Sequence, residues 1–525
     1  MKHLIIERNR YFDSVFLMRI SSELENLPGV TQAFVAMATP INVENLIKSG
    51  FQIDPESETV QPADLIIAIE SDSNETAAAV REHLDRLLTG GTDDEATSSP
   101  TAGVSSLDAA LTVDPEMNLA LISVPGIHAE REARRALQRG LHVMLFSDNV
   151  PIEEEIALKD NAIERGLLMM GPDCGTAIIH GAALGFANAC RSGTVGIVGA
   201  SGTGIQEISS LVHQLGGGIS QAIGTGGRDL SEAVDGRMTR FGIAALGRDP
   251  DTEVIVVVSK TPSPAVVDKV IQALAATDKP GVVHFIGGRS EQISDKLETT
   301  ATLADAAAAA VAKAGIEINQ AAGLASPSVS SAAPTTDSRL GETVHTHAAR
   351  GRIVGLYCGG TLCQETWNIL HQAGIDVRSN VAGDKARKIY PDEAATGHVV
   401  WDLGDDAFTV GKPHPMIEPS LRDSRVAQAG EDSTVGVVLA DCVIGYGAHD
   451  NPAASLAAAA VQASTAAKKA GRNPAILVAS VTGTEQDPQH LDRQRKLLRD
   501  AGVIVAPSNA AAAKWVVNWM KGRTS

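Results

Sequence analysis

The sequence predicts an α/β protein with several Rossmann-like or flavodoxin-like parallel-sheet domains and a small α/β subdomain at the amino terminus. Short apolar runs alternate with helical segments of about 10–15 residues, which is the pattern of a doubly wound parallel sheet. Many of the 49 glycines stand at the ends of apolar runs, where tight strand-to-helix turns need them. A chain of 525 residues exceeds what one hydrophobic core organises, so several domains are expected.

Residues 1–90 are predicted to form the small α/β subdomain. Apolar runs and helical segments alternate in the order strand 3–7, helix 12–27, strand 31–37, helix 42–50, strand 63–70 and helix 74–88. Residues 91–106 are rich in Gly, Ser, Thr and acidic side chains, and this composition predicts a linker.

Residues 107–190 are predicted to form a parallel-sheet domain. In such sheets, ligands bind beyond the carboxyl ends of the strands. Two turns follow predicted strands here, and their residues are the candidate lining of a substrate or coenzyme pocket: Pro125, Gly126, Gly171, Pro172 and Asp173.

Residues 191–318 and 351–521 are predicted to be two copies of one domain, joined by an Ala-, Ser- and Pro-rich linker at 319–350. The segments 193–207 and 351–365 share Gly, Gly-Thr and Gln-Glu at one offset, 361 − 203 = 158. The same offset also superposes His213 and Gly216 on His371 and Gly374. Identities spread over about 20 residues at a single offset indicate a duplication.

In each copy a strand ends at a small-residue turn that opens a helix. Free backbone N–H groups and the positive end of the helix dipole face outward at such a turn, and they suit an anion. The candidate phosphate-binding residues are Ser201, Gly202, Thr203, Gly359, Gly360 and Thr361. The alternative is that these glycines serve only tight helix–strand packing.

The segment 222–230 follows the next strand and supplies further candidates. Gly226 and Gly227 permit close backbone approach to a ligand, and Arg228 can fork onto phosphate or carboxylate. The alternative is a solvated Arg228–Asp229 turn.

Polar side chains gather in the fourth domain at Asp402, Asp405, Asp406, Lys412, His414 and Arg422. His414, fixed between two prolines, is the candidate proton-transfer group. The alternatives are a magnesium-coordinating loop and a purely structural loop.

Charge and cysteine content narrow the function classes. A formal charge of −19 argues against nucleic acid or an anionic membrane as the partner, but not against a small anionic substrate. The five cysteines show no Cys-x-x-Cys spacing, so they are expected to be reduced and buried, and no metal is predicted. With no signal peptide or membrane span predicted, the expected compartment is the cytoplasm.

Several long motifs resemble the FdrA family, which is described as acyl-CoA synthetase-like and related to succinyl-CoA synthetase. The motifs are GPDCGTAIIHG (171–181), GIVGASGTGIQE (196–207), AIGTGGRDL (222–230), KPHPMI (412–417), DCVIGYGAHDNP (441–452) and GTEQDPQ (483–489). The resemblance implies a CoA-binding-like domain at 107–190. It also implies ligase-like domains at 191–318 and 351–521, of the synthetase α-chain and β-chain types.

Two departures limit what the resemblance implies. The synthetases carry a phosphohistidine after the strand that corresponds to 280–288, whereas this chain has no histidine there and His284 falls inside the strand. Lys260 stands where the family's partner Glu is expected. No segment has the pattern of an ATP-grasp domain, so no ATP site is predicted.

The resemblance implies an enzyme that uses an already activated phosphate. FdrA members are associated with oxamate carbamoyl transfer in ureide catabolism, so the expected ligands are carbamoyl phosphate or CoA. Companion transferase subunits and a homo- or hetero-oligomer are expected as partners. Two alternatives remain open: a true acyl-CoA ligase, and a non-catalytic scaffold subunit of a complex.

Overall fold

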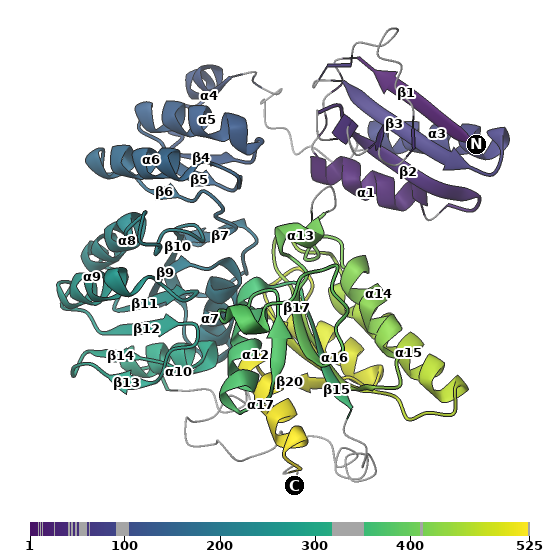
Figure 1. The fold of residues 1–525 in the computed structure, drawn as a ribbon. Coiled ribbons are helices and arrows are strands. Elements are labelled where there is room, and N and C mark those ends of the chain that lie inside the picture. Colours follow the sequence, from purple (N-terminus) through teal and green to yellow (C-terminus); the bar gives the residue numbers. More distant parts are fainter. Residues whose placement is uncertain are drawn as a thin grey trace. The chain divides into compact units, whose positions relative to one another are not determined.

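The computed structural model describes residues 1–8, 10, 12, 14–25, 27–39, 42–43, 46–47, 50–51, 60–61, 64–90, 104, 106–317, 351–409 and 413–522 (Figure 1). The predicted linkers at 91–106 and 319–350 therefore fall largely outside the described residues, and the predicted helix at 42–50 falls partly outside them. Contacts divide the chain into an amino-terminal unit, Met1–Ser106 with Asp406–His414, and a main unit, Leu107–Asp405 with Pro415–Ser525.

The amino-terminal unit is a three-stranded antiparallel sheet with helices. Strands β1 (Lys2–Glu7), β2 (Val30–Met37) and β3 (Leu65–Ser71) pair in the order β1-β3-β2. Helices α1 (Ser14–Glu25) and α3 (Asn74–Gly90) bury leucines such as Leu17 and Leu84 in its core, as their helical spacing predicts. The predicted strands and the two longer helices are confirmed.

The main unit begins with a small parallel sheet and its helices. After α4 (Leu107–Val113), strands β4 (Leu119–Ile122), β5 (His142–Leu145) and β6 (Met169–Met170) pair in parallel. Helices α5 (Gly126–Gln138) and α6 (Ile152–Glu164) connect them, as parallel neighbours require.

An eight-stranded sheet follows, with its strands in the order β13-β14-β12-β11-β9-β10-β7-β8. Its strands are β7 (Thr176–Ile179), β8 (Ala182–Gly185), β9 (Ser192–Ala200), β10 (Ile219–Gly224), β11 (Val254–Ser259), β12 (Gly281–Phe285), β13 (Glu291–Gln292) and β14 (Leu297–Thr299). Its helices are α7 (Gly202–Gln214), α8 (Arg237–Arg248), α9 (Pro264–Ala275) and α10 (Leu303–Lys313). The antiparallel hairpin β7–β8, which precedes the predicted boundary at residue 190, extends this sheet beside β10.

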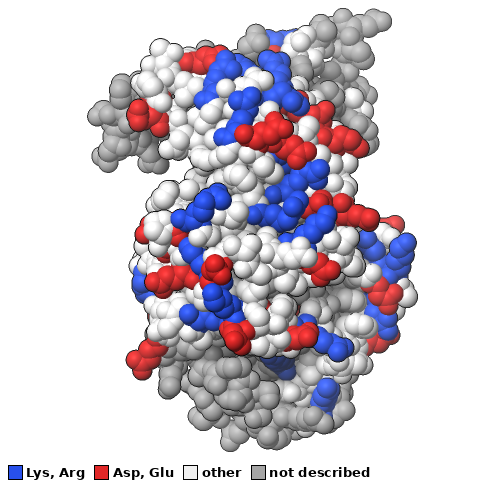
Figure 2. Space-filling model, turned by 90° about the vertical axis from the view of Figure 1, so that its left-hand side faces the viewer, with Lys and Arg blue, Asp and Glu red and all other residues white. Residues whose placement is uncertain are grey.

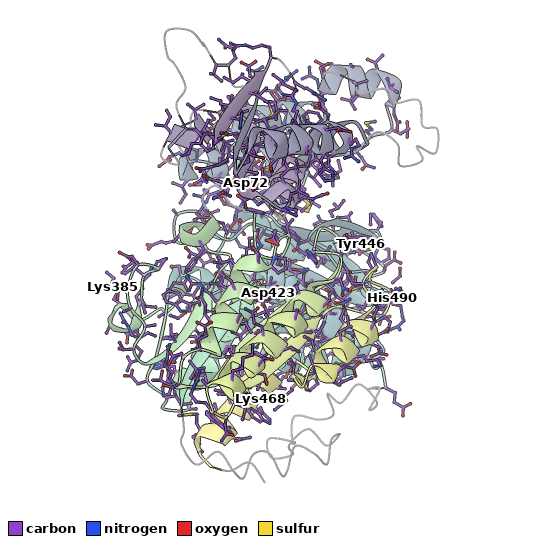
Figure 3. The ribbon with its side chains drawn as sticks, turned by 90° about the vertical axis from the view of Figure 1, so that its right-hand side faces the viewer. Asp72, Lys385, Asp423, Tyr446, Lys468 and His490 are labelled. Atoms are coloured by element: carbon purple, nitrogen blue, oxygen red, sulfur yellow. The ribbon has the colours of Figure 1, made fainter. Side chains whose placement is uncertain are left out.

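The last sheet is six-stranded and parallel, in the order β16-β17-β15-β18-β19-β20. Its strands are β15 (Arg352–Tyr357), β16 (Val377–Ser379), β17 (His398–Asp402), β18 (Val435–Val443), β19 (Ile476–Thr482) and β20 (Ile504–Ala506). The α-helices associated with it are α12 (Gly360–Gln372), α14 (Ser420–Ala429), α15 (Pro452–Lys469), α16 (Leu491–Asp500) and α17 (Asn509–Met520). Helix α13 (Asp406–Thr409) belongs to the amino-terminal unit. Asp423, Lys468 and His490, labelled in Figure 3, lie on α14, in the last turn of α15 and at the N-cap of α16.

The two large sheets repeat one arrangement. The order β14-β12-β11-β9-β10 corresponds to β20-β19-β18-β15-β17, with a helix leaving β9 and β15 at equivalent places. Helices α7, α10, α12 and α17 contact one another between the sheets (Figure 1). One buried apolar cluster, including Ile205, Leu303, Leu362 and Val516, runs through both domains. The α/β parallel-sheet fold that the sequence predicts is therefore confirmed.

Charged side chains interleave on the surface over α5, α6, α8 and α9 (Figure 2). Arg134 pairs with Glu154, Arg237 with Asp160 and Lys269 with Asp235. Basic side chains are thus neutralised locally on this face. Within the described residues, no helix combines the length and apolarity needed to cross a bilayer.

Candidate functional site

The two glycine-rich turns meet at the starts of α7 and α12. The Oγ of Ser201 lies 2.6 Å from the Oγ1 of Thr361, and the backbone N–H of Thr361 donates to the Oγ1 of Thr203 over 3.4 Å. Ser201 is the N-cap of α7 and its Oγ accepts from Gly204. The structure therefore brings Ser201, Thr203 and Thr361 together, although they are about 160 residues apart along the chain.

Both turns lie at topological switch points, where ligands bind in open α/β sheets. After β9, the chain forms β10 on one side of β9 and then crosses over to form β11 on its other side. The first N–H groups of each helix have no partner inside the helix. Among the described residues, no hydrogen-bond partner is recorded for the amides of Gly202, Thr203 and Gly360. These amides are the candidate anion-binding groups of the site.

The turn before α12 binds a carboxylate of the protein itself. Asp441, in β18, accepts the N–H groups of Cys358 and Gly359 at 2.7 Å each. A side-chain carbon at Gly359 would lie 2.9 Å from Thr203 Cγ2 and 3.1 Å from an Asp441 oxygen. The prediction that the Gly359 amide faces phosphate is therefore wrong, because Asp441 occupies it. Gly359 is instead the point where the two turns approach most closely.

Asp402, at the end of β17, lies against the first residue of α12. A side-chain carbon at Gly360 would be 2.5 Å from an oxygen of Asp402, whose other oxygen accepts the Gly404 N–H at 3.0 Å. Burial raises the pKa of Asp402 to about 7, and the positive charge of Lys260, which directly follows β11, partly opposes this. A carboxyl with this pKa exchanges a proton readily at neutral pH.

Arg422 supports the second turn from behind. Its side chain is 1% exposed and donates to the carbonyls of Asp441 and Pro452 at 3.0 and 3.2 Å. It also pairs with Asp423 at 2.7 Å. Because every direction of the guanidinium is taken up by the protein, Arg422 holds Asp441 in place and does not face a ligand.

The predicted glycines of the third domain pack against the protein itself. Side-chain carbons at Gly224 and Gly226 would lie 2.3 and 2.1 Å from the carbonyl oxygens of Thr176 and Pro172. At Gly227 the nearest atom would be a carboxylate oxygen of Asp173, at 2.9 Å. The close approach predicted for a ligand at Gly226 and Gly227 is thus made by the turn around Pro172.

The other predicted pocket residues also approach their own chain closely. At Gly171, a side-chain carbon would lie 2.3 Å from the carbonyl of Leu145, and at Gly126, 2.3 Å from that of Asp148. Pro125 is the N-cap of α5. These contacts set the packing of the small parallel sheet and do not leave room for a side chain.

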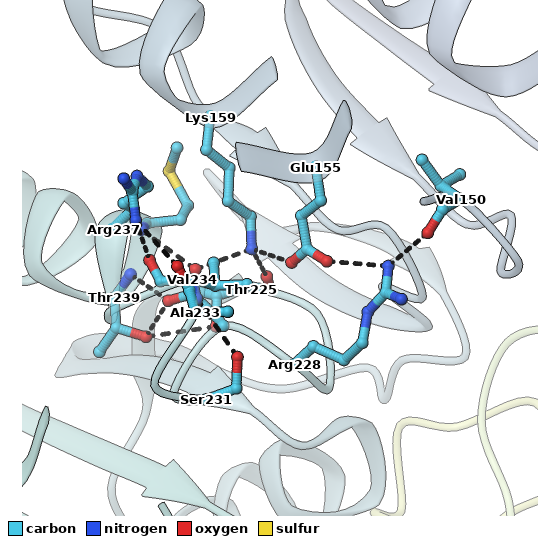
Figure 4. A network of polar contacts seen from close by, with 12 residues as sticks. Val150, Glu155, Lys159, Thr225, Arg228, Ser231, Ala233, Val234, Arg237 and Thr239 are labelled. Carbon is cyan, nitrogen blue, oxygen red and sulfur yellow. Dashed lines mark hydrogen bonds and ion pairs between the residues drawn. The ribbon is translucent and has the colours of Figure 1, made fainter. Parts of the chain in front are cut away.

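Arg228 lies at the exposed edge of an ionic network whose other charged members, Glu155, Lys159 and Asp229, are buried (Figure 4). Its guanidinium pairs with Glu155 at 2.9 Å and donates to the carbonyl of Val150 at 2.7 Å. The Nζ of Lys159 contacts Glu155, Asp229 and the Thr225 carbonyl at 2.7, 2.7 and 2.9 Å. The network fastens the 225–229 turn to α6. Arg228 thus has a carboxylate of the protein as partner, but its side chain is 43% exposed, in keeping with the solvated-turn alternative, and its phosphate role stays a prediction.

The two histidines that the sequence singles out are both withdrawn from solvent, wholly or in part. His414 is half-buried in the segment Asp406–His414, which belongs to the amino-terminal unit, and burial lowers its pKa to about 4. Lys412 of the same motif lies outside the described residues. His284 is fully buried in β12, with its Nδ1 3.0 Å from the Thr300 carbonyl, as predicted. The segment 286–302 after this strand contains no histidine.

The five cysteines are free: four are buried and Cys190 is half-buried. Burial raises the pKa of the Cys174, Cys190 and Cys442 thiols to about 12. None is suited to act as a thiolate nucleophile at neutral pH.

Three family models match parts of the chain. The CoA-ligase model matches residues 356–518 and the CoA binding domain model matches 191–287. The latter match falls on the domain that the resemblance assigned a ligase-like role, and not on 107–190. A model described as "AllF, heavy metal-associated domain" matches residues 1–103.

Residues 1–103, which match the heavy metal-associated domain model, do not fit a soft metal ion. Residues 1–103 contain no cysteine, and the thiolates that such ions prefer are therefore missing. Within the described part of the chain, no group of three or more His, Cys, Asp or Glu side chains is placed to hold a metal.

Known proteins resemble the chain over its whole length and over parts of it. YahF of Escherichia coli K12 is 42% identical over 515 residues, which cover 96% of both chains. A mitochondrial succinate–CoA ligase [ADP-forming] subunit alpha-2 of Trichomonas vaginalis is 29% identical, over 33% of this chain and 57% of its own length. The subunit alpha of Aquifex aeolicus is 30% identical, over 27% of this chain and 48% of its own. This chain thus aligns with about half of each ligase subunit.

Among solved structures, a similar chain is the dinucleotide forming acetyl-coenzyme A synthetase 1 of Ca. Korarchaeum cryptofilum in complex with phosphate and ADP. It is 15% identical, covers 86% of this chain and 94% of its own, and has a TM-score of 0.31.

Proposed function

Since the chain belongs to the family of YahF, an acyl-CoA synthetase-like family related to succinyl-CoA synthetase, we propose that it catalyses group transfer from an acyl or carbamoyl phosphate held between α7 and α12. The observation that carries this proposal is the meeting of the turns that begin α7 and α12, where the Oγ of Ser201 lies 2.6 Å from the Oγ1 of Thr361. Two positive helix ends directed at one point favour a group with two or more negative charges.

Phosphate binding exchanges one set of hydrogen bonds for another. The hydroxyls of Ser201, Thr203 and Thr361 are all less than 10% exposed and bond across the two turns. A phosphoryl group that enters between them takes over these hydroxyls together with the amides of Gly202 and Gly360. Charge-assisted bonds to the anion are stronger than the hydroxyl–hydroxyl bond that they replace.

The chemistry follows from this placement. A nucleophile attacks the acyl or carbamoyl carbon, the carbon–oxygen bond to phosphate breaks, and phosphate leaves with the electron pair. The helix ends stabilise the negative charge that develops on the leaving phosphate. The Asp402 carboxylate accepts the proton of the nucleophile, and takes the place that the sequence assigned to His414.

Two molecules, CoA and oxamate, are candidates to accept the transferred acyl or carbamoyl group. Which of them is used distinguishes an acyl-CoA ligase from a carbamoyltransferase. The matches to CoA-ligase and CoA binding domain models favour CoA, as in an acyl-CoA ligase. The resemblance to the FdrA family favours oxamate, with carbamoyl phosphate as donor and companion subunits as partners. The assay therefore tests an acyl phosphate with CoA and carbamoyl phosphate with oxamate. The cytoplasmic location expected from the sequence stays a prediction.

Phosphate release is the measurement that tests the proposed function. The purified chain, alone and with its companion subunits, is expected to release phosphate from acetyl phosphate with CoA or from carbamoyl phosphate with oxamate. Asp402→Asn is expected to lower kcat by roughly 100-fold, because general base catalysis contributes at least that much. Asp376→Asn, at a side chain that is 87% exposed, is the control and keeps wild-type kcat. The absence of phosphate release with every pair and partner would refute the proposal.

A further inference from the structure

Two buried glutamates form hydrogen bonds between the two copies of the duplicated domain. Glu207 on α7 and Glu365 on α12 stand at the offset 365 − 207 = 158, and both are 2% exposed. Glu365 accepts the N–H of Leu303, the first residue of α10, at 2.8 Å. Glu207 accepts the N–H of Asn509, the first residue of α17, at 3.1 Å, and the hydroxyl of Thr482 at 2.5 Å. Each carboxylate thus caps a helix of the other copy.

Asn509 connects the two carboxylates. Its backbone N–H donates to Glu207, and its Nδ2 donates to Glu365 at 2.8 Å and to the Leu362 carbonyl at 2.9 Å. The residue is fully buried. In the first copy the corresponding helix start is occupied by Leu303, whose side chain has no donor. The connection therefore runs through one residue of one copy only.

We propose that Asn509 is a positioning residue that fixes the separation of the α7 and α12 N-termini. Glu207 and Glu365 each lie about one turn beyond the candidate phosphate turn on their own helix. Because both are held by one rigid buried residue, neither helix slides along the other without breaking a buried hydrogen bond. Binding groups must be held to about 0.5 Å to act together, and this connection supplies that precision. The effect of Asn509 on phosphate binding rests on the proposed function, whereas its effect on the spacing of α7 and α12 does not.

Hydrogen exchange tests the positioning role without any ligand. Asn509→Leu places in the second copy the residue type found in the first, at similar size. It removes the side-chain bonds to Glu365, the Leu362 carbonyl and the Thr366 hydroxyl. Exchange of the amides in 201–207 and 359–365 is expected to become roughly tenfold faster, as loss of a buried hydrogen bond implies. Ser508→Ala is the matched control, because it removes the N-cap bond to Ala511 at the same helix start but leaves Asn509 in place.

The outcomes separate positioning from simple stabilisation. Both variants lower the thermal midpoint, but only Asn509→Leu speeds exchange at both turns and weakens the affinity for inorganic phosphate about tenfold, or 1.4 kcal/mol. Unchanged exchange in Asn509→Leu, or equal acceleration in Ser508→Ala, overturns the inference. If wild-type chain binds no phosphate while exchange responds as expected, the proposed function fails and the positioning role stands.

Discussion

Replacing Lys159 by methionine is expected to lower the free energy of unfolding of the main unit by about 3 kcal/mol, at the low end of what removing one partner of a buried ion pair costs. Lys159, Glu155 and Asp229 are all fully buried, and the Nζ of Lys159 lies 2.7 Å from both carboxylates. Methionine matches the length of lysine, so little packing is lost. The cost comes from two buried carboxylates that lose their shared cation.

The remaining partners keep the loss from being larger. Glu155 still pairs with Arg228, and Asp229 still accepts from the backbone and hydroxyl of Thr239 at 2.8 and 2.7 Å. Urea denaturation followed by circular dichroism measures the change. Hydrogen exchange in α6 and in 225–229 shows whether the loss is local to the turn that this network fastens.

Lys496→Met is the matched control. Lys496 and Asp500 also form an i,i+4 pair, at 2.5 Å, but their side chains are 73% and 61% exposed. Exposed pairs of this kind contribute about 0.3–0.5 kcal/mol. An equal, small loss in both variants would show that the Lys159 network carries no stability.

Glu365→Gln is expected to change how stability depends on pH. Burial raises the pKa of Glu365 from 4.5 to about 7, against the opposing hydrogen bonds from Leu303 and Asn509. A raised pKa in the folded chain means that the protonated carboxyl is favoured there. Its contribution to stability is therefore complete below pH 4.5 and is lost as the pH rises through 7.

The size of the effect follows from the shift. A difference of about 2.5 pKa units corresponds to roughly 3 kcal/mol at 1.36 kcal/mol per unit. Glutamine does not titrate, so the free energy of unfolding of the variant minus that of wild type rises by this amount between pH 4.5 and 8.

All four tryptophans lie within 351–521, so tryptophan fluorescence reports unfolding of the domain that contains Glu365. Glu431→Gln, at an exposed side chain of the same domain, is the control. A difference that stays constant with pH in Glu365→Gln would contradict the prediction.

Local sequence patterns predicted the features that depend on local structure. The strands and helices around Ser201 and Thr361, the burial of His284 and the duplication at an offset of 158 all rest on periodicity or on repeated residues. The duplication makes the two turns equivalent, whereas their meeting depends on the packing of α7 against α12.

The errors concern contacts between distant residues. Nothing near Arg228 in the sequence indicates Glu155 or Lys159, which are about 70 residues away. Gly226 was assigned to a ligand because a glycine reports close approach of some group and does not reveal that the group is Pro172. The capping roles of Glu207 and Glu365 were missed, although both belong to the repeated Gln-Glu pair. The available signal was a repeated Glu on two helices that contain no other Asp, Glu, Lys or Arg.

Titration of the chain with inorganic phosphate by isothermal calorimetry tests most directly whether α7 and α12 form one anion site. We expect one phosphate to bind per chain. We expect Gly359→Val to abolish binding, since a side chain there is driven against Thr203 and Asp441. Gly397→Val, at a glycine with open space around it, is expected to bind as wild type does. Two phosphates per chain, or undiminished binding in Gly359→Val, would contradict a shared site.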